Sequence, residues 1–151
     1  MSREKVEAVG KMQDYIESHI NDPITLLDLA RACGCSPWHA SRAFKELMGK
    51  TPFEYIRVLR MSRAALRLRD EDVKIIDVAF DFVFDTHEGF TRAFSREFGL
   101  TPSEYKTRTP PVKLFIPYQI KTSYRYKLKK EMEMNGVKTE QKSDRKMQTV
   151  F

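Results

Sequence analysis

Apolar residues recur at intervals of three and four along the first hundred positions, which is the period of an amphipathic helix and not of a strand. The apolar stripe of the first helix, predicted over residues 4–20, consists of Val9, Met12, Ile16 and Ile20. The same period predicts further helices over 26–32, 37–48, 53–69 and 75–82, one ending at Phe98, and one starting at Pro102. The pattern therefore predicts an all-α fold.

Capping residues mark where these helices begin and end. Asn21-Asp22-Pro23 breaks the first helix, and Thr25 suits the start of the next, since its hydroxyl can accept a free backbone N–H of the first turn. Gly34 ends that helix, at a turn position where positive φ favours glycine. Ser36 then caps a helix with Pro37 at its first position. Helix, tight turn and helix is the geometry that projects a second helix into a DNA groove.

A fourteen-residue pattern occurs twice, as RAFKELMGKTPFEY at 42–55 and as RAFSREFGLTPSEY at 92–105. The copies share eight positions, and each describes the end of a helix, a glycine stop and a Thr-Pro start. Before the second copy, the pattern predicts a turn near Val83-Phe84 and a helix capped by Asp85. Two similar units predict two similar contacts with one repetitive partner, such as duplex DNA.

The net charge of +6 is unevenly distributed. Residues 1–105 carry 15 Lys and Arg against 17 Asp and Glu, whereas residues 106–151 carry 12 against 4. The high pI therefore comes from the tail, and alone it does not indicate that the folded part binds nucleic acid. Within that part, residues 31–69 hold nine basic residues and two acids, and residues 70–91 hold seven acids and one Lys. Only the first of these stretches suits phosphates.

Each helix that follows a predicted turn separates an apolar face from a polar one. In the first, an inward stripe of Ala40, Phe44 and Leu47 leaves an outward set of Trp38, Ser41, Arg42 and Lys45. In the second, a stripe of Phe90, Phe94 and Phe98 leaves two outer rows, His87, Thr91 and Ser95, and Glu88, Arg92 and Arg96. Arg can bond guanine through two N–H groups, and Lys can reach phosphates. The alternative for either helix alone is a solvated face, which the duplication disfavours.

Two long runs carry a family resemblance. The first comprises Leu29-Ala30, Gly34, Ser36, Arg42-Ala43-Phe44, Gly49, Thr51-Pro52, Tyr55 and Arg57. The second comprises Ile76, Ala79, Phe84-Asp85, Phe90-Thr91-Arg92-Ala93-Phe94, Phe98-Gly99, Thr101-Pro102 and Tyr105. Over roughly residues 6–108, the chain resembles the DNA-binding domain of the AraC/XylS family of bacterial transcription regulators.

The resemblance implies two helix-turn-helix subdomains in residues 1–108, joined by a long linker helix, that insert two helices into adjacent major grooves of double-stranded DNA. By position, the DNA-binding residues of the first unit would be Ser36, Trp38, His39, Ser41, Arg42 and Lys45. Those of the second would be Thr86, His87, Glu88, Gly89, Thr91 and Arg92, to which the outer row adds Arg96.

The chain departs from the family pattern in its second unit. Val83 stands where the family usually has glycine in the turn, and a β-branched residue at positive φ is strained by about 1–3 kcal/mol unless the turn is reshaped. Asp85 and Glu88 also place acid on the helix expected to approach phosphates. The first unit is therefore the safer assignment of a DNA contact.

Residues 109–151 lie outside the repeat and form a basic tail. Pro110-Pro111 and Pro117 oppose a helix, and aromatic residues alternate with Lys and Arg from Tyr118 to Lys130. Such a stretch can bind nucleic acid, but a solvated interdomain linker is favoured. Residues 147–151 are typical of the start of a strand. By the family resemblance, the tail leads to a gyrase-inhibitor-like effector domain; the chain is then a fragment, and a small-molecule inducer binds beyond it.

Other classes of function are less favoured. Cys33, Cys35 and His39 fall short of a structural zinc set, and neither a nucleophile motif nor a phosphate loop occurs, so we expect no enzyme, metal or other cofactor. No apolar run reaches the length of a membrane span, and the two cysteines are too close for a disulfide, which indicates a cytoplasmic protein. The main alternative is a protein-interaction module whose acidic second unit contacts RNA polymerase.

Overall fold

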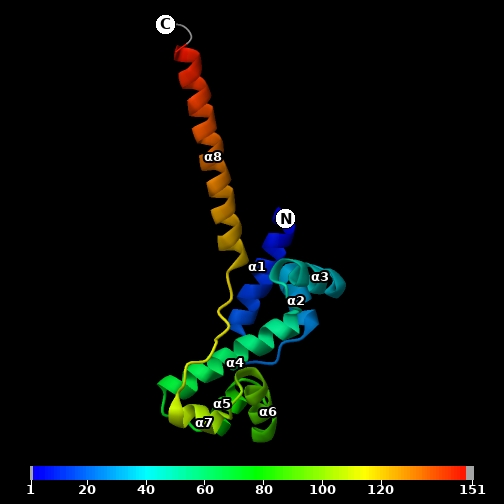
Figure 1. Cartoon of the computed structure of the whole chain (residues 1–151). Coiled ribbons are helices and arrows are strands. Elements are labelled where there is room, and N and C mark those ends of the chain that lie inside the picture. Colours follow the sequence, from blue (N-terminus) through cyan, green and yellow to red (C-terminus); the bar gives the residue numbers. More distant parts are fainter. Residues whose placement is uncertain (1, 149–151) are drawn as a thin grey trace.

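The computed structural model describes the backbone of residues 2–148 and the side chains of residues 2–136. Within this range the secondary structure is entirely helical: α1 (Arg3–Ser18), α2 (Leu26–Cys33), α3 (Pro37–Met48), α4 (Pro52–Asp70), α5 (Ile75–Asp81), α6 (His87–Phe98), α7 (Pro102–Arg108) and α8 (Ile120–Gln148). Figure 1 shows α4 between two groups of helices, α1–α3 and α5–α7, with α8 projecting away from both. The predicted all-α fold is confirmed.

The predicted caps determine most of these boundaries. The Thr25 hydroxyl accepts the backbone N–H of Asp28, and the Asp28 carboxylate accepts that of Thr25, which lowers the pKa of the Asp28 carboxyl. Thr51 and Glu54 form the same reciprocal box at the start of α4. α2 ends at Gly34, whose φ of 68° lies in the left-handed region where glycine is unstrained.

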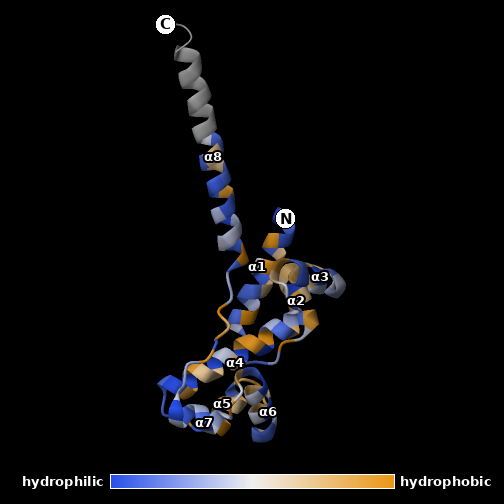
Figure 2. Ribbon diagram, in the orientation of Figure 1, coloured by the Kyte–Doolittle hydropathy of each residue, from blue (hydrophilic) through white to orange (hydrophobic). Residues whose placement is uncertain are grey.

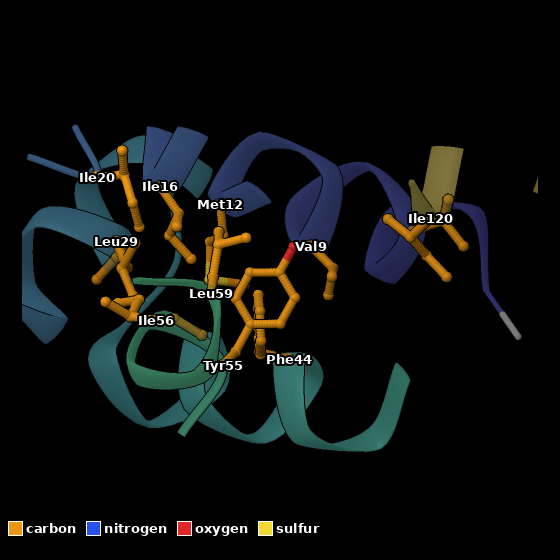
Figure 3. Close-up of a cluster of buried hydrophobic side chains, with 13 residues drawn as sticks. Val9, Met12, Ile16, Ile20, Leu29, Phe44, Tyr55, Ile56, Leu59 and Ile120 are labelled. Atoms are coloured by element: carbon orange, nitrogen blue, oxygen red, sulfur yellow. The ribbon is translucent and has the colours of Figure 1, made fainter. Parts of the chain in front are cut away.

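Two separate cores hold the two helix groups together. The first packs α1, α2 and α3 against the start of α4, as Figure 3 shows, and its largest buried side chains include Met12, Ile16, Leu29 and Phe44. The second packs α5, α6 and α7 against the end of α4 and includes Leu68, Phe90, Phe94 and Tyr105. Figure 2 shows apolar (orange) and polar (blue) positions interspersed along α1 and α4. Burial of apolar surface therefore stabilises each unit around its own centre.

Helix α4 is a wall of both cores. Its first half contributes Tyr55, Ile56 and Leu59 to the first core, and its second half contributes Met61, Ala64, Ala65 and Leu68 to the second. At about 1.5 Å per residue, its 19 residues extend about 28 Å. Arg60 of α4 also bonds to the segment that follows α1, since it donates to the carbonyl oxygens of Ile20 (3.0 Å) and Asp22 (2.7 Å). The two units are thus built on one continuous rod.

Residues 112–120, here called the strap, cross from one core to the other. Val112 and Leu114 pack against the second core, whereas Phe115 and Ile120 pack against the first. Buried Gln13 of α1 fixes the strap, because its amide donates to the Tyr118 carbonyl at 2.9 Å and accepts the Ile120 N–H at 3.0 Å. The proposal of a solvated linker is therefore wrong for this segment.

Helix α8 starts at Ile120, within the segment that the sequence predicts to be a linker. Pro117 is the last proline of the chain, so no proline interrupts a helix after it. Ile120 is buried against α1, and Lys121 pairs with Asp14 at 3.3 Å. Met147 and Gln148 are helical, so the predicted strand is wrong there, and its residues 149–151 lie outside the described part. Across the described residues, every helix is too short or too polar to span a bilayer.

Candidate nucleic-acid interface

Helix α3 presents a polar face because its apolar face is fully occupied. Ala40 and Phe44 are completely buried, and the Phe44 ring meets the Tyr55 ring edge-on, with centroids 5.0 Å apart. The opposite face carries Trp38, whose side chain is 61% exposed although it is a large apolar group. Because tryptophan is enriched at interfaces, an exposed indole on a polar face favours a binding surface.

The structure brings the residues predicted for the first unit onto this face. Trp38, His39, Arg42 and Lys45 are exposed, and Ser41 is half-buried. Ser36 is exposed, but its hydroxyl accepts the backbone N–H of His39 at 3.2 Å and lies 2.7 Å from the His39 imidazole Nδ1. The hydroxyl of Ser36 is therefore engaged in capping α3 and is less available to a ligand than the other exposed side chains of this face.

Arg42 lies within a cluster of charged and aromatic side chains. Its guanidinium carbon lies 4.9 Å from the centre of the Trp38 ring, and its Nε donates to Glu46 at 3.2 Å. Lys5 of α1 donates to the other oxygen of Glu46 at 2.8 Å. The hydrogen bond from Lys5, followed by that from Arg42, holds the pKa of the Glu46 carboxyl below its usual value. These residues line an open groove of about 660 Å³ between α1 and α3.

The second turn keeps the backbone of the first without its glycine. Val83 has a φ of 70°, against 68° for Gly34, so the turn is not reshaped at this residue. In both turns, the backbone N–H of the next residue donates to the carbonyl oxygen five positions earlier. Cys35 donates to Ala30 and Phe84 donates to Ala79, each at 3.0 Å. Val83 therefore retains the strain that glycine avoids.

The second turn is one residue longer than the first, which corrects the predicted cap. Thr86, and not Asp85, is the N-cap of α6, because its hydroxyl accepts the Gly89 N–H at 3.0 Å. In the first turn, only Cys35 lies between Gly34 and Ser36, the N-cap of α3. In the second, both Phe84 and Asp85 lie between Val83 and Thr86. Gly34 and Val83 are 49 positions apart in the sequence, whereas Ser36 and Thr86 are 50 apart. This change in spacing between equivalent residues is the sequence signal of the extra residue.

The second unit presents its predicted residues less uniformly. Thr86, His87, Glu88, Arg92 and Arg96 are exposed, whereas Gly89 and Thr91 are half-buried. Within the described part of the chain, the Thr91 hydroxyl is buried without a hydrogen-bond partner. A base contact by Thr91 would require a different side-chain rotamer. With Glu88 in its first turn, α6 offers phosphates a less favourable surface than α3 does.

The sequence analysis missed Lys5, which lies 41 residues from its partner Glu46. No local pattern joins the two, because they meet only when α1 packs against α3. Cys33 and Cys35 are free thiols, and burial raises the pKa of Cys33 to about 11. Among the described residues, no group of His, Cys, Asp and Glu side chains is arranged to hold a metal ion.

A family model described as a helix-turn-helix domain matches residues 29–108. Regulatory protein SoxS of Salmonella typhimurium is 34% identical over 108 residues, which cover 72% of this chain and 99% of SoxS. A solved structure of a probable AraC family transcriptional regulator from Rhodopseudomonas palustris is 28% identical, with a TM-score of 0.61, and covers 69% of this chain and 98% of that one. The chain belongs to the AraC family of transcription regulators. The resemblance seen in the sequence is confirmed.

Some relatives are much longer than the part that matches this chain. Right origin-binding protein of Escherichia coli K12 is 38% identical over 96 residues, which cover 64% of this chain and 33% of that protein. The chain therefore spans about a third of the length of this relative. Because the family consists of transcription regulators, the prediction that the chain is not an enzyme is also confirmed.

Proposed function

We propose that the protein binds double-stranded DNA in a sequence-specific manner and thereby regulates transcription, with α3 and α6 entering adjacent major grooves. The observation that carries this proposal is the duplicated arrangement of tight turn and exposed polar helix at the two ends of α4. Figure 1 shows α3 in the helix group at one end of that rod and α6 in the group at the other end. Successive major grooves on one face of B-DNA lie about 34 Å apart, close to the length of α4.

Electrostatics support α3 as the principal contact. Arg42 and Lys45 are exposed on this helix, and its single acid, Glu46, is neutralised by cationic neighbours. Trp38 adds an exposed aromatic surface that can pack against a thymine methyl group or a sugar. The name of the relative called right origin-binding protein also describes a protein that binds a DNA site. We therefore assign Ser36, Trp38, His39, Ser41, Arg42 and Lys45 to the first contact.

We assign a weaker contact to the second unit, through Thr86, His87, Glu88, Gly89, Thr91, Arg92 and Arg96. Residues 1–108 form the DNA-binding domain in this proposal, and residues 109–151 serve as the connection to an effector domain. A small-molecule inducer is expected only if the protein has such a domain. A DNA partner supports the cytoplasm as the location of the protein in this proposal.

Exposed acids of the second unit favour one alternative function. Asp72, Asp77, Asp85 and Glu88 are exposed, and among the described residues the structure shows no ion pair for any of them. Such a surface suits a basic patch on a protein such as RNA polymerase. In that case, charge reversal at Arg42 would leave complex formation intact, whereas in the DNA-binding proposal it abolishes operator binding.

The proposal is tested by comparing Arg42→Ala with Lys45→Ala on a duplex selected from random sequences. Arg42 has the fork geometry for guanine, so its loss should cost about 1–3 kcal/mol and relax preference at one base pair. Loss of Lys45 should weaken all sequences alike and reduce the salt slope by about one unit. Equal and sequence-independent losses for both variants would refute the role of Arg42. Failure to select any duplex would refute the proposed function.

A further inference from the structure

Glu46 is the one acidic residue of α3, and cations bond it from two directions. Its Oε1 accepts the Arg42 Nε–H from the same helix, and its Oε2 accepts the Lys5 Nζ from α1. An unpaired carboxylate on a helix that approaches phosphates would weaken binding to every sequence alike. Here two cations surround one anion, so Lys5, Arg42 and Glu46 together keep a net positive charge.

The two contacts of Arg42 leave the terminal part of its guanidinium free. Glu46 engages Nε, and the Trp38 ring lies over the guanidinium carbon. Among the described residues, the structure shows no hydrogen bond to Nη1 or Nη2, which supply the fork that bonds the O6 and N7 atoms of guanine. A long side chain already held from two directions also loses less conformational freedom when it binds.

We infer that Glu46 is a positioning residue that orients Arg42 toward a base pair, and that Lys5 holds Glu46 in place. The inference rests on the proposed function, because it specifies how α3 discriminates between DNA sequences. Neither Glu46 nor Lys5 needs to touch a base for this effect. The sequence preference of α3 thus depends in part on a residue of α1.

The test measures the ratio of affinities for the preferred duplex and for a duplex changed at the base pair that Arg42→Ala reveals. Glu46→Ala should lower this ratio about fivefold or more, since a good bidentate pair accounts for roughly 5–150-fold discrimination. Glu46→Gln keeps an oxygen for the Arg42 Nε and removes only the charge, so it should stay within about twofold of wild type. In an Arg42→Ala background, Glu46→Ala should leave the ratio unchanged. Lys5→Ala should lower the ratio by less.

Glu7→Ala is the matched control, because Glu7 is another exposed carboxylate paired with a cation, Arg3, at 3.3 Å on α1. This variant should leave the ratio unchanged. If Glu46→Ala and Glu46→Gln strengthen binding to both duplexes equally and leave the ratio at its wild-type value, Glu46 merely repels phosphates and the inference is overturned. A wild-type protein without sequence preference would overturn both the inference and the proposed function.

Discussion

Val83 provides a direct measure of backbone strain, since it adopts the conformation that Gly34 adopts in the first unit. A β-branched residue in the left-handed region costs about 1–3 kcal/mol. Val83→Gly removes this cost. It also destabilises the fold in two ways: the packing of a half-buried side chain is lost, about 1 kcal/mol, and the greater freedom of glycine in the unfolded chain costs about 0.5–1 kcal/mol. Val83→Ala loses the same packing and keeps a Cβ at positive φ. The glycine variant should therefore be more stable than the alanine variant by about 1 kcal/mol.

Thermal unfolding followed by circular dichroism should show this difference as a melting temperature about 4 °C higher for Val83→Gly than for Val83→Ala. The exposed Lys11 of α1 supplies the control, because at an ordinary helical position alanine should exceed glycine by about 1 kcal/mol. Gly34→Ala should lose about 1 kcal/mol from the backbone alone, since an added Cβ would meet nothing within 4 Å. If Val83→Ala equals or exceeds Val83→Gly in stability, the second turn is not strained.

Further predictions concern DNA contacts, the strap and the thiols. Arg42 and Arg92 occupy equivalent repeat positions, but the acids near Arg92 should make Arg92→Ala less costly to DNA binding than Arg42→Ala. Hydroxyl-radical footprints should show strong protection in one groove and a weaker protection in its neighbour that fades as salt rises. Equal protection of both grooves would contradict this prediction. Gln13→Leu leaves strap backbone groups unpaired and should cost about 2–4 kcal/mol in urea unfolding, whereas a loss below about 1 kcal/mol would mean that water replaces the amide. Because burial raises the pKa of Cys33 to about 11, its alkylation at pH 8 should be far slower than that of an unfolded control; equal rates would disprove this.

Helix boundaries were predictable where their signals are local. Ser36-Pro37 and Thr51-Pro52 start helices at the expected positions because capping and proline act within one turn. The start of α6 was misplaced, since Asp85 and Thr86 are both good caps and only the longer turn decides between them. In the tail, a local signal led to a wrong prediction. The prolines oppose a helix only near their own positions, but their effect was extended to later residues that in fact form α8.

The outward face of α3 followed from helical periodicity, but the contacts that organise it did not. Lys5 meets Glu46 across 41 residues, and Gln13 meets Ile120 across 107. Such pairs depend on how helices pack in three dimensions, and a single sequence carries no periodic signal for them. The docking of the strap was missed for the same reason, because Gln13 on a helix is indistinguishable by type from a solvated side chain.

Both α4 and the strap join the two units, and Asn21 of the first unit also donates to the Asp81 carbonyl of the second at 2.8 Å. A single rod would let each unit rotate about its end, whereas a second tie anchored on both cores restricts such rotation. A mismatch between the spacing of α3 and α6 and that of the grooves must then be absorbed by the DNA, at an elastic cost of about 1–6 kcal/mol for a short bent site. Flexible base steps lying between the two contacts should therefore be preferred, although no side chain touches them.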